Sequence, residues 1–360
     1  MNDTTLALIW LNSFGMSAAK CHALLELVDE PAQLKSDLEK LKSVIINKFN
    51  QETYDKLYFA CGQEYLDMLL EEISRYRLEI IHIYDDRYSN YLKEIDIPPI
   101  LLYCRGNTDL LNTRSIAVVG TRKPTRYGKD VTTELVGGLC KYGFTIVSGL
   151  ARGIDGIAHR IALLNNAPTI AVLGNGLDSV YPPEHREIAT SIVNNGGLVI
   201  SEYRVGEKPL PFHFPERNRI ITGLSRGVLV TEAGENSGTL ITMNCAIEMG
   251  RDLYVVPGSI YSKTSIGTNS MIKNYNTSLT TSIDDILVGY GIDKIENEDI
   301  TVEQLSIVES TIITELEKEN MHIEEIIDFT NLSINEINST LMRLEILGLV
   351  KKLHGNKYGV

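Results

Sequence analysis

The sequence predicts an α/β protein built around a mostly parallel sheet. Six short runs rich in β-branched residues recur between positions 115 and 258, and stretches of helix length separate them. Nearly every run ends in glycine or a small polar residue. Apolar strands that alternate with helices are typical of a parallel sheet covered on both faces, in which ligands bind at the carboxyl ends of the strands. We therefore expect an extended Rossmann-like core over residues 101–290.

The flanks of this core have different textures. Residues 1–100 show apolar residues at helical spacing and predict a small helical domain, similar to SAM or helix-hairpin-helix modules. A helix-hairpin-helix turn at Gly15 could bind a phosphate through its backbone N–H groups. A domain with only a packing role is favoured, because the turn contains a single glycine. Residues 281–304 hold seven acidic residues and one lysine, which predicts a solvated linker. Residues 300–360 predict three helices and a terminal hairpin, the pattern of a winged helix.

Composition favours a soluble cytoplasmic protein that does not enter a membrane. The 360 residues carry a formal net charge of −13, without a basic leader and without the ~18-residue apolar run of a membrane span. The segment 114–257 nevertheless holds 15 Lys or Arg against 13 Asp or Glu, so an anion site can lie in the core. The five cysteines have no paired spacing, and we expect neither disulfides nor a metal site.

The first strand of the core leads into a segment suited to an anion. Gly120 lets a ligand approach the backbone, and a helix that begins near Tyr127 is expected to present its N-terminal dipole. The segment differs from the GxGxxG fingerprint, and the chain has no GxxxxGK[ST] loop, so no nucleotide cofactor is predicted. The candidate ligand-binding residues here are Gly120, Thr121, Arg122, Lys123 and Arg126.

The next two strands end in the same way. Two glycines bracket Arg152 after the second strand, which suits the close passage of a sugar-phosphate backbone. His159 follows on the next helix, and a hydrogen-bonded structural histidine is favoured because no nucleophile or second metal-type ligand accompanies it. The candidate residues at these two strand ends are Ser148, Gly149, Arg152, Gly153 and Gly174.

Residues 212–221 interleave aromatic side chains with two arginines and an amide. Aromatic rings stack on bases, arginines bind phosphates, and an amide hydrogen-bonds a base edge. Stacking on one ring contributes ~1 to 3 kcal/mol per base. We expect Phe214 to be exposed for this purpose, although a core position is the alternative. The candidates are Phe214, Arg217, Asn218 and Arg219.

The ordered series VVGTR, SGLARGIDGIAH, AVLGNGLDSVYP, FHFPERNRIITGLS and GRDLYVVPGS resembles the DNA-processing protein A (DprA/Smf) family over roughly residues 85–273. The resemblance implies a single-stranded DNA-binding core that dimerises, protects incoming DNA and loads the RecA recombinase during natural transformation. It implies neither catalysis nor a cofactor. The family's DNA pocket maps onto Gly120 and Arg122 of its G-[ST]-R motif and onto Phe214, Arg217 and Asn218 of F-P-x-R-N.

The competing function is a nucleotide-processing enzyme. Related Rossmann-like nucleotide hydrolases use a G-G-x-G-T-x-x-E turn, and Thr242 stands where their glutamate would be. Glu232 and Glu235 lie nearby but lack the expected spacing. We therefore favour a role for the turn in binding a phosphate or capping its helix, through Ser237, Gly238 and Thr239.

Overall fold

The computed structural model describes the chain except for residues 236, 276, 294–305, 331, 347–348, 354 and 360, and except for the side chains of 307, 335 and 346. Its contacts divide the chain into two compact units, residues 1–292 and 293–360. No helix among the described residues has the length and apolar character needed to cross a membrane.

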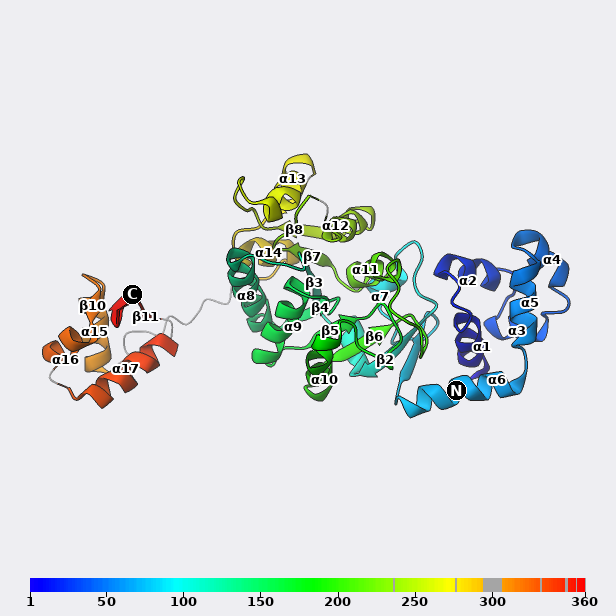
Figure 1. The fold of residues 1–360 in the computed structure, drawn as a ribbon, viewed down its shortest axis with the longest axis horizontal. Helices are drawn as coiled ribbons and strands as arrows, with labels where there is room; N and C mark the ends of the chain where they lie inside the picture. Colours follow the sequence, from blue (N-terminus) through cyan, green and yellow to red (C-terminus); the bar gives the residue numbers. More distant parts are fainter. Residues whose placement is uncertain are drawn as a thin grey trace. The chain divides into compact units, whose positions relative to one another are not determined.

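A mixed but mostly parallel sheet organises the first unit (Figure 1). Its first two strands are antiparallel to their neighbours and the others are parallel. The six strands expected from the sequence, together with one further short strand, form the parallel part. This arrangement confirms the predicted fold class. In spatial order the described strands are β1 (Glu79–His82), β2 (Leu101–Gly106), β6 (Leu198–Ser201), β5 (Thr169–Val172), β4 (Thr145–Ser148), β3 (Ser115–Val119), β7 (Gly227–Val230), β8 (Asp252–Val255) and β9 (Ser278–Leu279).

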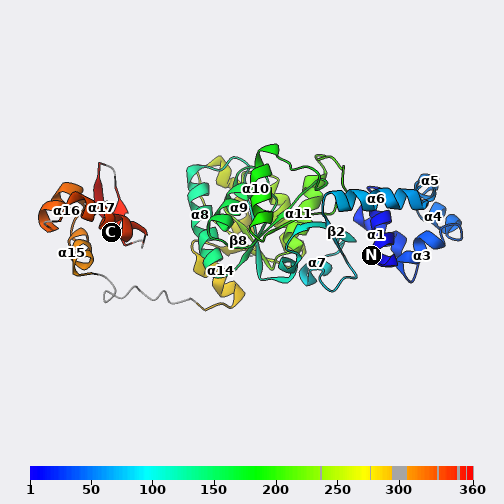
Figure 2. The same cartoon turned by 90° about the horizontal axis from the view of Figure 1, so that it is seen from below.

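Helices cover both faces of the sheet, as the continuously buried strands require (Figure 2). One face packs against α8 (Arg126–Lys141), α9 (Ile154–Leu164) and α14 (Ile283–Tyr290). The other face packs against α11 (His213–Gly223), α12 (Thr239–Glu248) and α13 (Ile266–Asn274). The remaining helices of this region are α7 (Asn90–Lys93), α10 (Arg186–Asn194), and the short 3-10 helices η1 (Thr108–Asn112), η2 (Pro183–His185) and η3 (Lys263–Ser265).

The N-terminal helices belong to the same compact unit as the sheet. Their apolar side chains share one core with β2, β6 and α10, and Trp10 is fully buried in it. Asn12 joins the two parts, because its amide donates to the Glu202 carbonyl at 3.0 Å and accepts from the Tyr103 hydroxyl at 3.1 Å. The helices are α1 (Asp3–Asn12), α2 (Ala18–Leu25), α3 (Pro31–Ser36), α4 (Lys42–Lys48), α5 (Gln51–Phe59) and α6 (Gln63–Arg75).

Two segments differ from the sequence prediction. The region expected to be helical contains β1, which joins the sheet edge because its run of β-branched residues buries against β2. The acidic segment 281–304, expected to be a linker, begins with α14 instead. Ile286 and Leu287 of that helix are buried against α8, while Asp284 and Asp285 lie in its first turn, where acidic side chains stabilise a helix. Residues 294–305 lie outside the described part.

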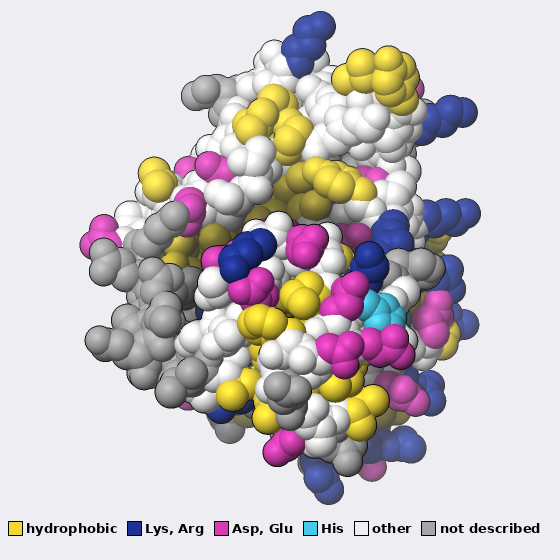
Figure 3. All heavy atoms as spheres, turned by 90° about the vertical axis from the view of Figure 1, so that its left-hand side faces the viewer, with side chains coloured by type: hydrophobic (Ala, Val, Ile, Leu, Met, Phe, Trp, Pro, Cys, Tyr) yellow, Lys and Arg dark blue, Asp and Glu magenta, His cyan; other side chains and the backbone are white. Residues whose placement is uncertain are grey.

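The second unit is the predicted winged helix. Its helices are α15 (Ile307–Leu316), α16 (Ile323–Thr330) and α17 (Ile334–Ile346), and its strands β10 (Met321–His322), β12 (Lys357–Gly359) and β11 (Lys351–Lys352) form a small antiparallel sheet. Arg343 on α17 pairs with Glu309 on α15 at 3.3 Å. In Figure 3, basic, acidic and hydrophobic side chains all appear on the side that faces the viewer.

Candidate nucleic-acid interface

A cavity of about 720 Å³ opens at the carboxyl ends of the parallel strands, and we call it the strand-end pocket. The segment after β3 forms one wall, α11 forms the second and the N-terminus of α12 forms the third. Ten of the residues expected to bind a ligand line it. They are Gly120, Thr121, Arg122, Lys123, Phe214, Arg217, Asn218, Ser237, Gly238 and Thr239.

Arg122 and Phe214 meet across this pocket. The Arg122 guanidinium carbon lies 5.8 Å from the centroid of the Phe214 ring, within the range of a cation–π contact. Arg122 is exposed and Phe214 is partly exposed. The centroid of the Tyr181 ring, which also lines the pocket, lies 5.4 Å from that of Phe214. The pocket therefore combines an aromatic surface for a base with a cation for a phosphate.

Helix α11 positions the side chains of one wall. Phe214, Asn218 and Ile221 recur at spacings of four and three residues, so they share the face of α11 that lines the pocket. Gly174 supports this wall from behind, since a Cβ atom there would come 3.3 Å from the Phe214 ring. Gly174 thus acts through Phe214 and does not line the cavity itself.

The N-terminus of α12 opens into the pocket. Ser237 Oγ accepts a hydrogen bond from the Thr239 backbone N–H at 3.2 Å and donates one to the Thr239 hydroxyl at 2.9 Å. Gly238 is the N-cap, and nothing lies within 4 Å of the place where its Cβ would be. The expected helix start is confirmed. Hydroxyls at the positive end of a helix dipole favour an anion.

Arg217 has a different place from the one expected of a phosphate-binding residue. Its side chain is 4% exposed, and its guanidinium donates to the carbonyls of Gly149, at 2.6 Å, and Val172. Burial lowers the pKa of Arg217 to about 10, an effect that neighbouring Asp155 opposes. The arginine forms the floor of the pocket and holds the ends of β4 and β5 together.

Asp155 completes this floor. Its carboxylate accepts hydrogen bonds from the backbone N–H groups of Gly149 and Ala151, at 3.1 and 3.4 Å. Burial raises the pKa of Asp155, while Arg217 and these backbone donors oppose the rise. The acid and the arginine therefore fix the loop after β4.

The N-terminus of α8 does not present a free dipole to a ligand, contrary to our expectation. The buried Glu232 carboxylate accepts from both the backbone N–H and the hydroxyl of the N-cap Thr125, each at 2.9 Å, and from Thr264. An internal anion thus occupies the place that a phosphate would take. Arg126, at the start of the helix, is 96% exposed, pairs with Asp130 at 3.6 Å and does not line the pocket.

Five other predicted residues lie outside the cavity wall. Ser148 and Gly149 are buried, and the Ser148 hydroxyl donates to the Val118 carbonyl at 2.7 Å. Gly153 adopts a φ of +77°, and a Cβ there would come 2.3 Å from the Thr121 carbonyl oxygen, so it is needed for packing. The other two residues form ion pairs, one on the surface and one at the wall of a separate cavity. These are Arg152, paired with Glu184, and Arg219, paired with Glu202.

His159 and Glu232, two of the groups considered for catalysis, have internal partners. His159 is fully buried, hydrogen-bonds Thr169 Oγ1 at 2.7 Å, and has its pKa lowered to about 3 by burial and by nearby His185 and Arg217. Glu232 holds the start of α8. Among the described residues, no group of three or more His, Cys, Asp or Glu side chains is placed to hold a metal ion.

Comparison with protein families identifies this architecture. The model described as DNA recombination-mediator protein A matches residues 79–291, more than half of the chain. The chain belongs to this family. The DprA winged helix domain matches residues 299–356 of this DprA-family chain.

Individual relatives agree with the assignment to the DprA family. The DNA processing protein DprA of Streptococcus pneumoniae is 42% identical over 241 residues, covering 67% of this chain and 83% of that protein. Protein Smf of Synechocystis is 36% identical over 327 residues, covering 80% and 82%. The crystal structure of the S. pneumoniae protein matches with a TM-score of 0.69 at 38% identity, covering 79% of this chain and 97% of that one.

A further structure of the DprA family is that of DNA processing protein A from Helicobacter pylori, reported for its unique single-stranded DNA binding mode. It matches with a TM-score of 0.54 at 31% identity and covers 60% of this chain and 97% of that one.

Several residues of the strand-end pocket wall were not predicted by the sequence analysis. Tyr181 had a signal, since Tyr181-Pro182-Pro183 follows a strand end, whereas Thr264 comes from a segment with no motif.

Proposed function

We propose that this protein binds single-stranded DNA in the strand-end pocket. The observation that carries the proposal is Arg122 lying 5.8 Å from the Phe214 ring, opposite the open N-terminus of α12. A base stacked on Phe214 would place its phosphates near Arg122, Lys123 and the helix end. The other predicted residues act by shaping this wall and floor. The H. pylori relative, whose structure was reported for its single-stranded DNA binding mode, supports the proposal.

We also propose a biological role, which membership of the family supports. The protein acts in the cytoplasm as a homodimer that protects incoming DNA and loads the RecA recombinase in natural transformation. Support comes from the similarity to DprA proteins over most of the chain. Ile260 and Tyr261, on the loop after β8, are 80% and 92% exposed, which supports contact with another protein surface.

The protein acts as a binder and not as a nucleotide hydrolase. Thr242 replaces the glutamate of the hydrolase turn, and Glu232 is committed to Thr125 and Thr264. Incubation with nucleoside monophosphates, followed by chromatography for free base, tests this choice. Efficient release of free base would instead favour the alternative function, a nucleotide-processing enzyme.

A salt titration tests the binding site directly. Each phosphate neutralised on a single strand contributes a slope of about −0.7 to log K against log salt. With Arg122 and Lys123 as the cations and Arg217 buried, we expect a slope of roughly −1.5 per protomer.

Two variants separate the contributions in that titration. Phe214→Ala should lower affinity roughly 5- to 100-fold without changing the slope, because stacking releases no counterions. Arg122→Ala should lower both affinity and slope. The measurement is fluorescence anisotropy with single-stranded and double-stranded oligonucleotides of one sequence. Unchanged affinity of Phe214→Ala at every salt concentration would remove the base-stacking site.

A further inference from the structure

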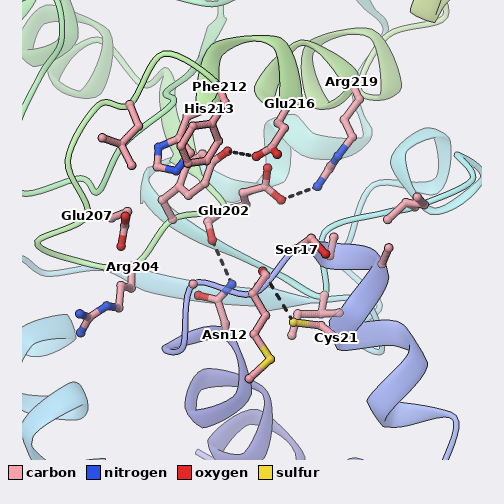
Figure 4. Close-up of a pocket in the computed structure, with 18 residues that line it drawn as sticks. Asn12, Ser17, Cys21, Glu202, Arg204, Glu207, Phe212, His213, Glu216 and Arg219 are labelled. Atoms are coloured by element: carbon pink, nitrogen blue, oxygen red, sulfur yellow. Dashed lines mark hydrogen bonds and ion pairs between the residues drawn. The ribbon is translucent and has the colours of Figure 1, made fainter. Parts of the chain in front are cut away.

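A second cavity, of about 410 Å³, lies between the N-terminal helices and the core, and we call it the N-terminal pocket (Figure 4). The turn between α1 and α2 forms one wall, with Asn12 and Ser17 at its ends. The segment after β6 and one face of α11 form the opposite wall, which carries Glu202, Glu216 and Arg219. This cavity lies next to the strand-end pocket. Of the two arginines in the 212–221 segment, Arg219 lines this cavity and Arg217 lines the strand-end pocket.

Helix α11 separates the two pockets. Phe212, Glu216 and Arg219 follow spacings of four and three residues and line the N-terminal pocket. Phe214 and Asn218 on the other face line the strand-end pocket. The preceding loop is divided in the same way, with Pro211 on one side and Leu210 on the other. A strand bound in one pocket therefore needs to cross only the rim of α11 to reach the other.

Aromatic side chains line the rim of the N-terminal pocket. Phe212 is 57% exposed, and its ring meets the His213 ring edge-on, with centroids 4.6 Å apart. His213 in turn stacks on Tyr203, with centroids 4.0 Å apart. The packed His213 and Tyr203 rings hold Phe212 in place while leaving it accessible. An exposed, supported ring is a stacking surface for an unpaired base.

The charged groups of this pocket disfavour a phosphate, since its three carboxylates outnumber its two arginines, Arg204 and Arg219. Glu202 pairs with Arg219 at 2.5 Å, which neutralises that arginine. Glu216 accepts a hydrogen bond from the Tyr203 hydroxyl at 3.0 Å, and Glu207 adds a further carboxylate. Carboxylates are acceptors, so they suit the exocyclic amino group of a base.

Arg219 also carries an unpaired donor, which a base reaches when the side chain shifts. Its Nη1 is buried and has no hydrogen-bond partner in the described structure. A buried unsatisfied donor calls for a ligand or a water molecule. Cytosine presents both complements, an amino group for a carboxylate and a carbonyl oxygen for a guanidinium N–H, whereas thymine lacks the amino group.

We propose that the N-terminal pocket binds one amino-bearing base of the single strand whose phosphates lie at the strand-end pocket. The inference rests on the proposed function and extends it, since it gives the N-terminal helices a part in binding. A volume of about 410 Å³ falls in the range of small-ligand sites and suits a single base. The pocket thereby confers a preference for cytosine over thymine at one position of the bound strand.

The test uses the full-length protein and thymidine 12-mers with one cytidine placed at each position in turn. Anisotropy titrations should show tighter binding for the cytidine probes, by roughly 5- to 30-fold. Phe212→Ala should lower the affinity for these probes roughly 5- to 100-fold, and Glu216→Ala should remove the preference. Both variants should keep the wild-type affinity for a thymidine tetramer, which fills only the strand-end pocket. The matched control is Phe59→Ala, an aromatic that is 86% exposed and lines neither pocket.

Cross-linking gives an independent measurement. Irradiation of a 12-mer with 5-iododeoxycytidine should attach peptides containing Tyr203 or Phe212. Attachment only at Phe214, or wild-type behaviour of Phe212→Ala and Glu216→Ala on every cytidine probe, would overturn the N-terminal pocket and leave the strand-end site intact. Failure of the wild-type protein to bind any oligonucleotide would overturn the proposed function and this inference together.

Discussion

Helices α8 and α12 both begin after a strand of the same sheet, yet only one of them offers its N-terminus to a ligand. At α8, the Glu232 carboxylate binds the N-cap Thr125. At α12, Ser237, Gly238 and Thr239 line the strand-end pocket, and the space beside Gly238 is open. A helix end is an anion site only where the protein has not already supplied an anion.

The two arginines of the pocket differ in the same way. Arg122 is exposed at the rim, whereas Arg217 is buried in the floor and its Nη1 donates to the carbonyls of Gly149 and Val172. Residue type alone therefore does not identify a ligand-binding group. The group must also lie where a ligand can reach it.

The largest expected effect separates the rim of the pocket from the start of α8. Arg122→Glu should weaken single-strand binding by roughly 1000-fold, because it removes a cation and adds repulsion at the same place. Arg126→Glu, the matched charge reversal four residues later, should change affinity no more than about 3-fold, since that exposed side chain lies outside the pocket. Anisotropy at physiological salt measures both. Equal losses would mean that the α8 end binds DNA after all.

The next largest effect is a loss of stability when the floor of the strand-end pocket is altered. Arg217→Met should lower the free energy of unfolding by about 3 kcal/mol, because it removes the cation near buried Asp155 and leaves two carbonyls without their donor. Asn218→Ala, on the pocket side of the same helix turn, should cost less than about 1 kcal/mol. Denaturant titrations provide the comparison. A fully stable Arg217→Met protein that no longer binds DNA would instead place the arginine in direct contact with the strand.

A carboxylate introduced at the N-terminus of α12 should block that helix end, as Glu232 blocks the N-terminus of α8. Gly238→Asp is expected to reduce single-strand affinity by on the order of 100-fold, because a carboxylate at the N-cap competes with phosphate. Gly238 has a negative φ of −58°, so a side chain fits without strain. Gly238→Asn has the same shape without the charge and should bind within about 5-fold of the wild type. Similar affinities for the two variants would exclude α12 from the phosphate site.

The smallest effect is a pH dependence from the buried His159. Its pKa falls from 6.5 to about 3 in the folded protein, so the unfolded chain takes up a proton first as the pH drops below 6.5. Stability is therefore lost on acidification, by about 2 kcal/mol between pH 8 and pH 5. His159→Gln should lower overall stability but remove this part of the pH dependence. Unfolding titrations of both proteins at the two pH values test it, and identical pH dependence would contradict the assignment.

Local patterns were enough to predict the α/β class, the six parallel strands and ten residues of the pocket wall. Strand runs that end in glycine, and aromatics interleaved with arginines, carry this information within short segments. The same patterns predicted the start of α12 at Ser237-Gly238-Thr239, since hydroxyl and glycine residues at a helix start act locally.

Only the tertiary structure decided which of these groups stay available. Glu232 reaches Thr125 across 107 residues, and Arg217 reaches Gly149 across 68, so no local pattern reveals that either is occupied. The N-terminal pocket depends on Asn12 meeting Glu202 across 190 residues. Spacing along the chain determines which residues share a helix face or a strand end. Whether a polar group on that face keeps a free hydrogen bond depends on distant partners that packing brings to it.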